Sequence, residues 1–192
     1  MSTVWQSDDY TLMREVRQGT SAFLVDLDST HFAQREPIIS IACPDYRRHW
    51  DKVGRIAELR GYSPKEDHQT HGLNWHGGVI RLVPGFPGNT QGDAEFCLKE
   101  LAFAVELTGI KDIAGYFHWP CGWISVSRVP LKQTFAALME AKRIAKDAIP
   151  NIKIKTVVHS DYGDLEPLGM KSYFAHPPRC RKWLQQSAQQ FA

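Results

Sequence analysis

Two short motifs carry side chains of the types that bind transition metals. Cys43 directly follows one short apolar run, and His118 and Cys121 follow another run later in the chain. Zinc favours a mixed set of sulfur and nitrogen ligands in tetrahedral geometry. Three protein ligands leave one coordination position open, which is typical of catalytic rather than structural zinc sites. The motifs therefore predict a zinc site made of these three side chains.

Two charged residues follow Cys43 at intervals of two positions. Asp45 is close enough in sequence to serve as a fourth zinc ligand. Alternatively, Arg47 holds the Asp45 carboxylate away from the metal in a bidentate ion pair, or Arg47 is a solvated surface charge. The sequence leaves these alternatives open. Cys97 and Cys180 have no histidine or acidic neighbour in a comparable frame, so we expect them to be buried thiols.

Short apolar runs alternate with segments of helical periodicity. This alternation predicts an α/β fold with a central, mostly parallel β-sheet of four to five strands flanked by helices. Expected strands cover 37–42, 79–83, 113–117 and 152–156, and expected helices cover 8–18, 50–61, 93–108 and 130–149. The last strand alternates lysines with apolar residues, which suits a sheet edge, and 62–78 is expected to be a long loop. Because the carboxyl ends of parallel strands meet at one edge of a sheet, Cys43 and His118 would lie close together.

Composition limits the classes of protein to which the chain can belong. It has 192 residues, 43% of them hydrophobic and 23% charged, with a formal net charge of +2. These values are typical of one soluble globular domain and exclude a disordered tail, a collagen-like chain and a coiled coil. There is no basic tract, so no nucleic-acid partner is expected, and no apolar run is long enough to span a membrane. Residues 1–10 are polar and acidic, unlike a secretory signal, so we expect a cytoplasmic protein.

Together, the two metal-binding motifs resemble the signature of the β-class carbonic anhydrases. Cys-x-Asp-x-Arg begins at Cys43, and His-x-x-Cys-Gly begins at His118. The resemblance runs from about Gln34 to the last expected strand, near Val158, and includes the order of strands and helices. Gln34 stands nine residues before Cys43, where the family places a glutamine that hydrogen-bonds near the substrate across the dimer interface.

This resemblance implies a zinc lyase in which a zinc-bound hydroxide attacks carbon dioxide to give bicarbonate. The residues to which it assigns roles are the zinc ligands Cys43, His118 and Cys121 and the catalytic residues Asp45, Arg47 and Gln34. It also implies a homodimer or homotetramer. We therefore expect an N-terminal arm with dimer contacts (1–36), a zinc-binding α/β core (37–165) and a C-terminal tail that packs on the core or on a partner (166–192).

Bulky residues around the second motif depart from the family pattern. Phe117 precedes the histidine and Trp123 follows Cys121-Gly122, where the family has small residues. Trp119 lies between the two ligands. These departures concern the substrate pocket more than the metal. Carbonyl sulfide and carbon disulfide are linear molecules like carbon dioxide, so their hydrolysis on the same site is one alternative. A non-catalytic zinc-binding regulatory protein, in which the two tryptophans fill the pocket, is another.

A different stretch resembles the first motif of haloacid-dehalogenase-type phosphatases. It is an apolar run followed by Asp26, Asp28 and Thr30 at alternate positions. In this alternative, Asp26 is the nucleophile and Asp28 the acid/base, with Mg²⁺ as cofactor, and Asp161 and Asp164 form the later acidic motif. Against it, the next apolar strand begins only seven residues after Thr30, and no lysine is well placed. The simpler interpretation of the first two aspartates is a polar turn.

Three histidines lie in the expected loop over 62–78. His68, His71 and His76 are candidates for a second metal site, but a glycine-rich loop does not hold side chains three positions apart on one face as a helix does. Solvated histidines are the simpler expectation. If the loop folds over the pocket, one of them, or His49, could carry protons to solvent, because imidazole titrates near neutral pH.

Overall fold

Strands and helices alternate along most of the chain. The computed structural model describes residues 7–18, 23–45, 49–63, 69–160 and 171–189. In chain order, with η for a 3-10 helix, the elements are α1 (Ser7–Arg17), β1 (Leu24–Asp26), η1 (Ser29–His31), β2 (Ile38–Ala42), α2 (His49–Leu59), β3 (Thr70–Asn74), η2 (Gly78–Leu82), α3 (Asp93–Thr108), β4 (Asp112–Trp119), α4 (Gly122–Val126), α5 (Leu131–Ala148), β5 (Lys153–Ser160), β6 (Lys171–Ala175) and α6 (Pro177–Gln189).

Within the described residues, one six-stranded sheet has the strand order β1-β6-β5-β4-β2-β3. The strands β3, β2, β4 and β5 run parallel, and β6 is antiparallel to both of its neighbours. The expected α/β fold with a mostly parallel sheet flanked by helices is therefore confirmed. The sheet is wider than the expected four to five strands because the short strands β1 and β6 extend it beyond β5.

Two expectations about the second parallel strand are wrong. Residues 79–83 do not form a strand, because the chain there winds into η2, and the strand that pairs with β2 is β3, inside the expected loop over 62–78. A short, fully buried apolar run does not distinguish a strand from a buried helical turn. In turn, β3 lies at the sheet edge with side chains that are at most half-buried, so its polar sequence carries no apolar signal.

The strand β5 lies inside the sheet, between β4 and β6, and not at the edge that its lysines suggested. Its lysines fall in the first half of the strand, whereas β6 pairs with residues 157–160 in the second half. Lys155 is half-buried and forms an ion pair with Asp112 of β4. The lysines therefore mark the open end of an internal strand.

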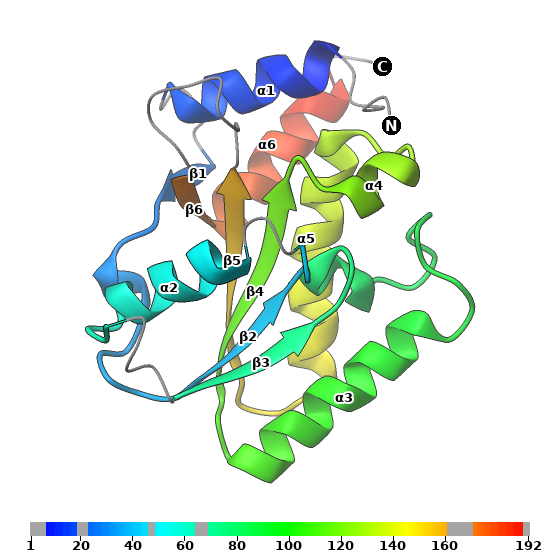
Figure 1. The fold of residues 1–192 in the computed structure, drawn as a ribbon. Coiled ribbons are helices and arrows are strands. Elements are labelled where there is room, and N and C mark those ends of the chain that lie inside the picture. Colours follow the sequence, from blue (N-terminus) through cyan, green and yellow to red (C-terminus); the bar gives the residue numbers. More distant parts are fainter. Residues whose placement is uncertain (1–6, 19–22, 46–48, 64–68, 161–170, 190–192) are drawn as a thin grey trace.

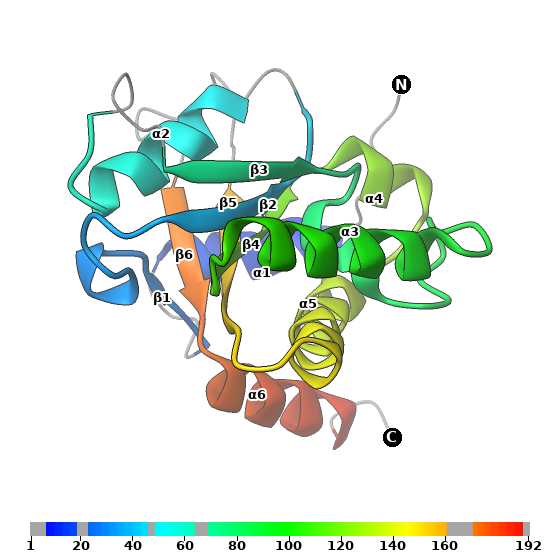
Figure 2. The same ribbon diagram turned by 90° about the horizontal axis from the view of Figure 1, so that it is seen from below.

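Two apolar cores lie on opposite faces of the sheet. The larger joins the strands to α1, α3, α5 and α6 through buried side chains that include Met13, Leu101, Phe135 and Cys180. The smaller joins them to α2 through residues such as Ile56. Figures 1 and 2 show α3 and α5 on one side of the strands and α2 on the other. This layering leaves the carboxyl ends of β2 and β4 side by side at one edge.

The N-terminal arm and the C-terminal tail meet within the chain, because β1 pairs with β6. In α1, Met13 packs into the larger core, and Asp9 Oδ1 accepts a hydrogen bond from the backbone N–H of Leu131 at the start of α5. The N-cap residue of α5 is Pro130, whose side chain cannot accept this bond, so Asp9 satisfies a helix donor from a distant segment. Contacts of the arm with a second subunit stay a prediction.

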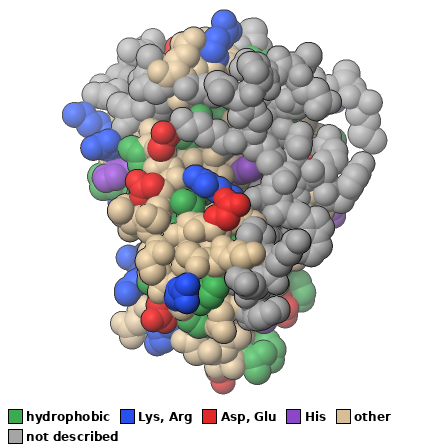
Figure 3. All heavy atoms as spheres, turned by 60° about the vertical axis from the view of Figure 1, so that its left-hand side comes forward, with side chains coloured by type: hydrophobic (Ala, Val, Ile, Leu, Met, Phe, Trp, Pro, Cys, Tyr) green, Lys and Arg blue, Asp and Glu red, His purple; other side chains and the backbone are tan. Residues whose placement is uncertain are grey.

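Charged side chains of both signs share the surface that Figure 3 shows. On this face, the lysines and arginines of described residues alternate with aspartates and glutamates, without a broad field of one sign. Within the described ranges, no helix combines the length and the apolar character that a membrane crossing needs.

A pair of glycines lets the chain after β3 approach the end of β4. Gly77 and Gly78 have φ angles of 85° and 61°, which residues with a Cβ atom rarely adopt. A Cβ on Gly78 would lie 2.1 Å from the backbone oxygen of Tyr116, and one on Gly77 would lie 2.3 Å from the Trp123 ring. The backbone at this turn therefore packs directly against β4 and α4, next to Cys43.

This close approach predicts an unequal cost for two alanine substitutions. We expect Gly78→Ala to lower the free energy of unfolding by about 2–4 kcal/mol, because the methyl group meets a backbone oxygen at a positive φ. Gly92→Ala is the matched control, since Gly92 also has a positive φ but open space around it. It should cost only about 1 kcal/mol. Urea unfolding of both variants checks the difference, and equal costs would contradict the packing argument.

Candidate metal centre

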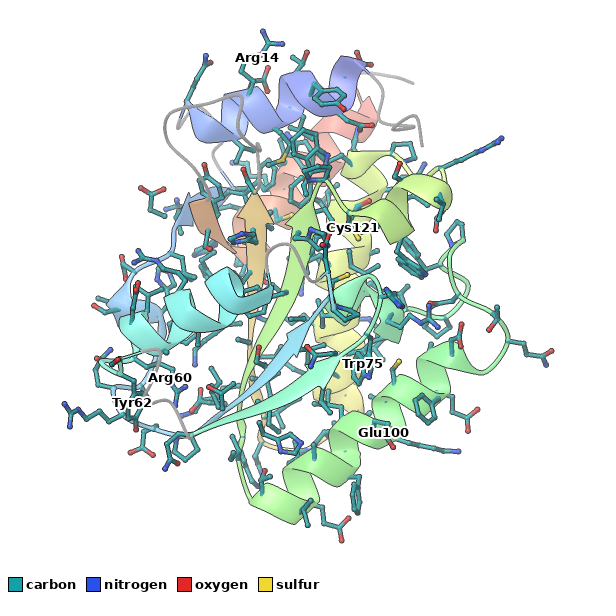
Figure 4. All side chains as sticks on the ribbon, in the orientation of Figure 1. Arg14, Arg60, Tyr62, Trp75, Glu100 and Cys121 are labelled. Carbon is teal, nitrogen blue, oxygen red and sulfur yellow. The ribbon has the colours of Figure 1, made fainter. Side chains whose placement is uncertain are left out.

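The structure brings together the three residues predicted to bind zinc. Cys43 follows the last residue of β2, His118 lies at the end of β4, and Cys121 stands between β4 and α4. Figure 4 shows Cys121 at the carboxyl end of β4. Because β2 and β4 are parallel neighbours, their ends converge, and one ligand atom from each residue lies within 4.8 Å of the other two. All three side chains are buried.

The two thiols of this cluster have very different proton affinities. A hydrogen bond with the Cys121 thiol is the main cause that lowers the pKa of Cys43. His118, through a hydrogen bond and its charge, and the backbone N–H of Gly77 lower this pKa further. Burial of the thiol opposes these effects. The same hydrogen bond and burial raise the pKa of Cys121 well above its usual range. Without a metal, the two shifts favour a thiolate on Cys43 that accepts a hydrogen bond from the Cys121 thiol.

His118 offers an unused nitrogen at this position. Its side chain is buried, and its Nε2 has no hydrogen-bond partner in the part of the chain that the structure describes. The Oδ2 atom of Asp45 lies 3.9 Å away, beyond hydrogen-bond distance. Leaving a buried polar atom unpaired is costly, and a cation bound by two thiolates and an imidazole would remove that cost. The chemistry of the donor set therefore fits zinc.

Asp45 is the predicted catalytic residue that the structure places beside the cluster. Its side chain is 12% exposed, so it lies between the buried ligands and solvent. Arg47, its predicted partner, lies outside the described residues. The distance from His118 is compatible with either predicted role of Asp45, as a ligand or as a neighbour of the open position.

Gln34 has a structural role within this chain. Its Nε2 donates hydrogen bonds to the backbone oxygens of Ser29 and Leu59, at distances of 3.1 and 2.9 Å. These bonds join the segment after η1 to the end of α2. The predicted role of Gln34 near a substrate of the partner subunit stays a prediction.

The two tryptophans that depart from the family pattern pack against neighbouring aromatic rings. Trp119 is buried and lies edge-on to Tyr10 of α1, with 5.2 Å between ring centroids. Trp123, in α4, stacks on Phe86 at 5.5 Å, and the Arg81 guanidinium lies 5.3 Å from the centroid of the same indole. Both indoles thus help to hold the segments around the ligands.

Of the aspartates of the phosphatase alternative, Asp26 and Asp28 lie in the described structure. Asp28 Oδ1 accepts hydrogen bonds from the backbone N–H and the hydroxyl of Thr30, so Asp28 caps η1. The hydrogen bond from the Thr30 hydroxyl lowers the pKa of Asp28. Asp161 and Asp164 lie outside the described residues. These contacts favour the polar-turn interpretation of Asp28.

The candidate second metal site of loop histidines is only partly covered by the described residues, and His71 and His76 belong to no metal-binding cluster there. His71 is in β3, opposite Ile39 of β2, and His76 is an exposed residue beyond the end of that strand. His68 and the side chain of His49 lie outside what the structure describes. Among the residues that it does describe, the one cluster suited to a metal is that of Cys43, His118 and Cys121.

A further buried histidine stands next to the ligand His118. His159 of β5 is the register partner of His118, and its Nδ1 lies 2.9 Å from the Ser172 hydroxyl of β6. Paired residues of adjacent strands point to the same face of a sheet, so the two imidazoles are neighbours there. The sequence carried a signal for this residue, because an apolar run ends in a histidine at both places.

Comparison with known proteins gives one solved structure to report. A carbonic anhydrase from Streptococcus mutans is similar to this chain with 13% sequence identity and a TM-score of 0.37, over 81% of this chain and 92% of that one. No family model and no curated protein sequence matches the chain.

The unequal thiols lead to a prediction for the metal-free protein. At neutral pH we expect one thiolate per chain, on Cys43, which is lost as pH falls through its lowered pKa. Burial raises the pKa of Cys97 to about 11 and that of Cys180 to about 12, so these thiols ionise only in strong base. The ultraviolet absorbance of thiolates, followed during a pH titration, measures this.

Two variants separate the source of the signal. Cys43→Ala should remove the thiolate absorbance at neutral pH, whereas Cys180→Ala should leave it unchanged. An unchanged signal in Cys43→Ala would show that the shared proton is assigned to the wrong sulfur.

Proposed function

We propose that the chain binds one zinc ion through Cys43, His118 and Cys121 and hydrates carbon dioxide to bicarbonate. The observation that carries the proposal is the convergence of these three buried ligands at the carboxyl ends of two parallel strands. Two thiolates and a neutral imidazole balance the charge of a divalent cation, so the buried site carries no net charge when loaded. The motif resemblance to β-class carbonic anhydrases gives the reaction.

Bound zinc supplies Lewis acidity, which makes water a nucleophile at neutral pH. The chain's own residues must hold the ion, position the water and admit the substrate. Cys43 and Cys121 provide the anionic ligands, with the Gly77 N–H directed at Cys43. Backbone N–H groups of Ile124 and Trp123, in the first turn of α4, stabilise negative charge on Cys121.

Asp45 supplies the polar group at the open side of the site. Its carboxylate lies 3.9 Å from His118 Nε2 and is 12% exposed, at the boundary between the cluster and solvent. With zinc bound, Asp45 would be the residue that accepts a hydrogen bond from the nucleophilic water and orients it. If the Asp45 carboxylate bound the metal instead, it would block the position that the water needs. Whether Asp45 is a ligand would therefore decide whether water can reach the metal.

The zinc site predicts a selective effect of cysteine and histidine substitutions. The purified chain should hold one zinc per molecule. Cys43→Ser and His118→Ala should each reduce bound zinc at least about ten-fold, because a ligand is lost from a three-ligand set. Elemental analysis measures the metal, and a stopped-flow assay with a pH indicator measures carbon dioxide hydration, which should disappear with it.

Cys97→Ala is the matched control for these variants. Cys97 is also buried, but it belongs to α3 and packs in the larger core. It should keep both zinc and activity. A zinc content that stays at one per chain in Cys43→Ser would disprove the ligand assignment. Zinc without carbon dioxide hydration, but with sulfide released from carbonyl sulfide or carbon disulfide, would redirect the proposal to those substrates. Zinc without any of these activities would favour a regulatory protein, and Mg²⁺-dependent phosphatase activity without zinc would favour the haloacid-dehalogenase alternative.

Asp45 predicts a separation of metal binding from turnover. Asp45→Asn should keep zinc, because the three ligands remain. It should lower turnover about 100-fold, because a neutral amide accepts a hydrogen bond from the water more weakly than a carboxylate does. Asp147→Asn changes an exposed carboxylate of α5 and should alter neither quantity. A normal turnover number in Asp45→Asn would exclude the orienting role.

A further inference from the structure

A positively charged hollow lies between α5 and α6, which pack side by side (Figure 2). Its volume is about 380 Å³. From α5 it is lined by Lys142, Arg143, Lys146 and Asp147, and from α6 by Arg181, Pro177 and Pro178. Four of these side chains are cationic and one is acidic, so the lining carries a net positive charge.

Three cations of the hollow form no ion pair among the described residues, although Glu140 of α5 attracts Arg181 from a longer distance. Within the described chain, no ion pair is formed by Lys142, Lys146 or Arg181, whereas Arg143 beside them is already held by Glu140 and Asp147. Like charges one turn apart on a helix repel, and so do like charges that face each other across two helices. Glu140 and Asp147 offset part of this repulsion, but the cations at the contact between α5 and α6 outnumber the acidic residues.

Lys142 is the cation most affected by this arrangement. Its Nζ lies 6.0 Å from the centroid of the Phe174 ring, partly out of solvent. Burial, together with repulsion from Lys146, Arg181 and Lys155, lowers its pKa to about 8. Lys155 forms an ion pair with Asp112, whereas Lys146 and Arg181 line the hollow together with Lys142.

We propose that this hollow binds a multiply charged oxyanion of the phosphate class. A guanidinium offers a planar pair of donors that matches two phosphate oxygens, and the two ammonium groups add charge from the opposite helix. A dianion would contact both helices at once and replace their repulsion by attraction. The first two residues of α6 are prolines without an N–H, so the side chains, and not the helix N-terminus, are the donors.

The volume of the hollow exceeds that of a phosphate ion, so a small metabolite that carries a phosphate group also fits. The proposal is independent of the zinc chemistry, because the hollow is built from α5 and α6, whereas the metal ligands follow β2 and β4. An occupied hollow would stabilise the folded chain, since a ligand that binds only the native state shifts the unfolding equilibrium.

Thermal unfolding of the 192-residue protein, whose zinc content is measured beforehand, tests the proposal with inorganic phosphate as the probe. At constant ionic strength, phosphate at about ten times its dissociation constant should raise Tm by about 3 °C, and sodium chloride should not. Lys142→Met and Arg181→Gln should each abolish most of this shift and weaken phosphate binding at least about five-fold in titration calorimetry.

Arg179→Gln is the matched control, because it makes the same change on the exposed side of α6 and does not line the hollow. It should keep the full response to phosphate. The proposal is overturned if phosphate gives no shift beyond that of chloride, or if the shift persists in both Lys142→Met and Arg181→Gln. Unchanged zinc content in all variants separates these results from effects at the metal ligands.

Discussion

The candidate metal centre depends on placing two sulfurs and a ring nitrogen within 4.8 Å of one another in the protein interior. At this spacing, and with little water, two thiolates cannot coexist without a cation, so the metal-free pair shares one negative charge. That charge is stabilised by the Cys121 thiol, His118 and the Gly77 N–H. The unpaired His118 Nε2 shows that these hydrogen bonds do not complete the site within the described residues. A divalent cation would satisfy all three donors together.

The sheet supplies this geometry through its parallel core. Pairing of β2 with β4 aligns their carboxyl ends, and the turn at Gly77 and Gly78 brings a backbone donor to the first ligand. α4 begins directly after Cys121 and directs N–H groups toward its sulfur. Each ligand is therefore supported by backbone that the fold holds in place. Metal binding and folding stability are thermodynamically linked in such a site.

Burial disfavours the charged form at both the Cys43 thiolate and the Lys142 ammonium, but the neighbours of the two groups act in opposite ways. At the metal centre, a thiolate is buried together with donors that favour its charge, so its pKa falls. Between α5 and α6, the ammonium of Lys142 is partly buried among other cations, and its pKa also falls, but because its charged form is disfavoured. The first arrangement retains charge for a cation to balance, and the second leaves a positive region for an anion to balance.

Sequence periodicity was sufficient where an element has a strong local pattern. The bounds of α3 follow from its apolar spacing and the stop at Gly109, and β2 and β4 follow from their apolar runs. The ligand types and their positions after those runs were enough to predict that Cys43 and His118 would meet. The prediction that Cys97 and Cys180 are buried thiols also came from their local context, and both are buried in the structure.

Tertiary structure decided the elements whose local pattern is ambiguous. The run at 79–83 is apolar enough for a strand, yet Gly77 and Gly78 turn the chain into η2, because their backbone must pass Tyr116 and Trp123. The polar strand β3 exists because β2 offers it a free edge, which no property of its own residues reveals. The sequence by itself determined which side chains can bind a metal. Long-range pairing alone decided which side chains face each other, including His159 beside His118 and Lys142 across from Arg181, since contacts between distant segments have no local signature.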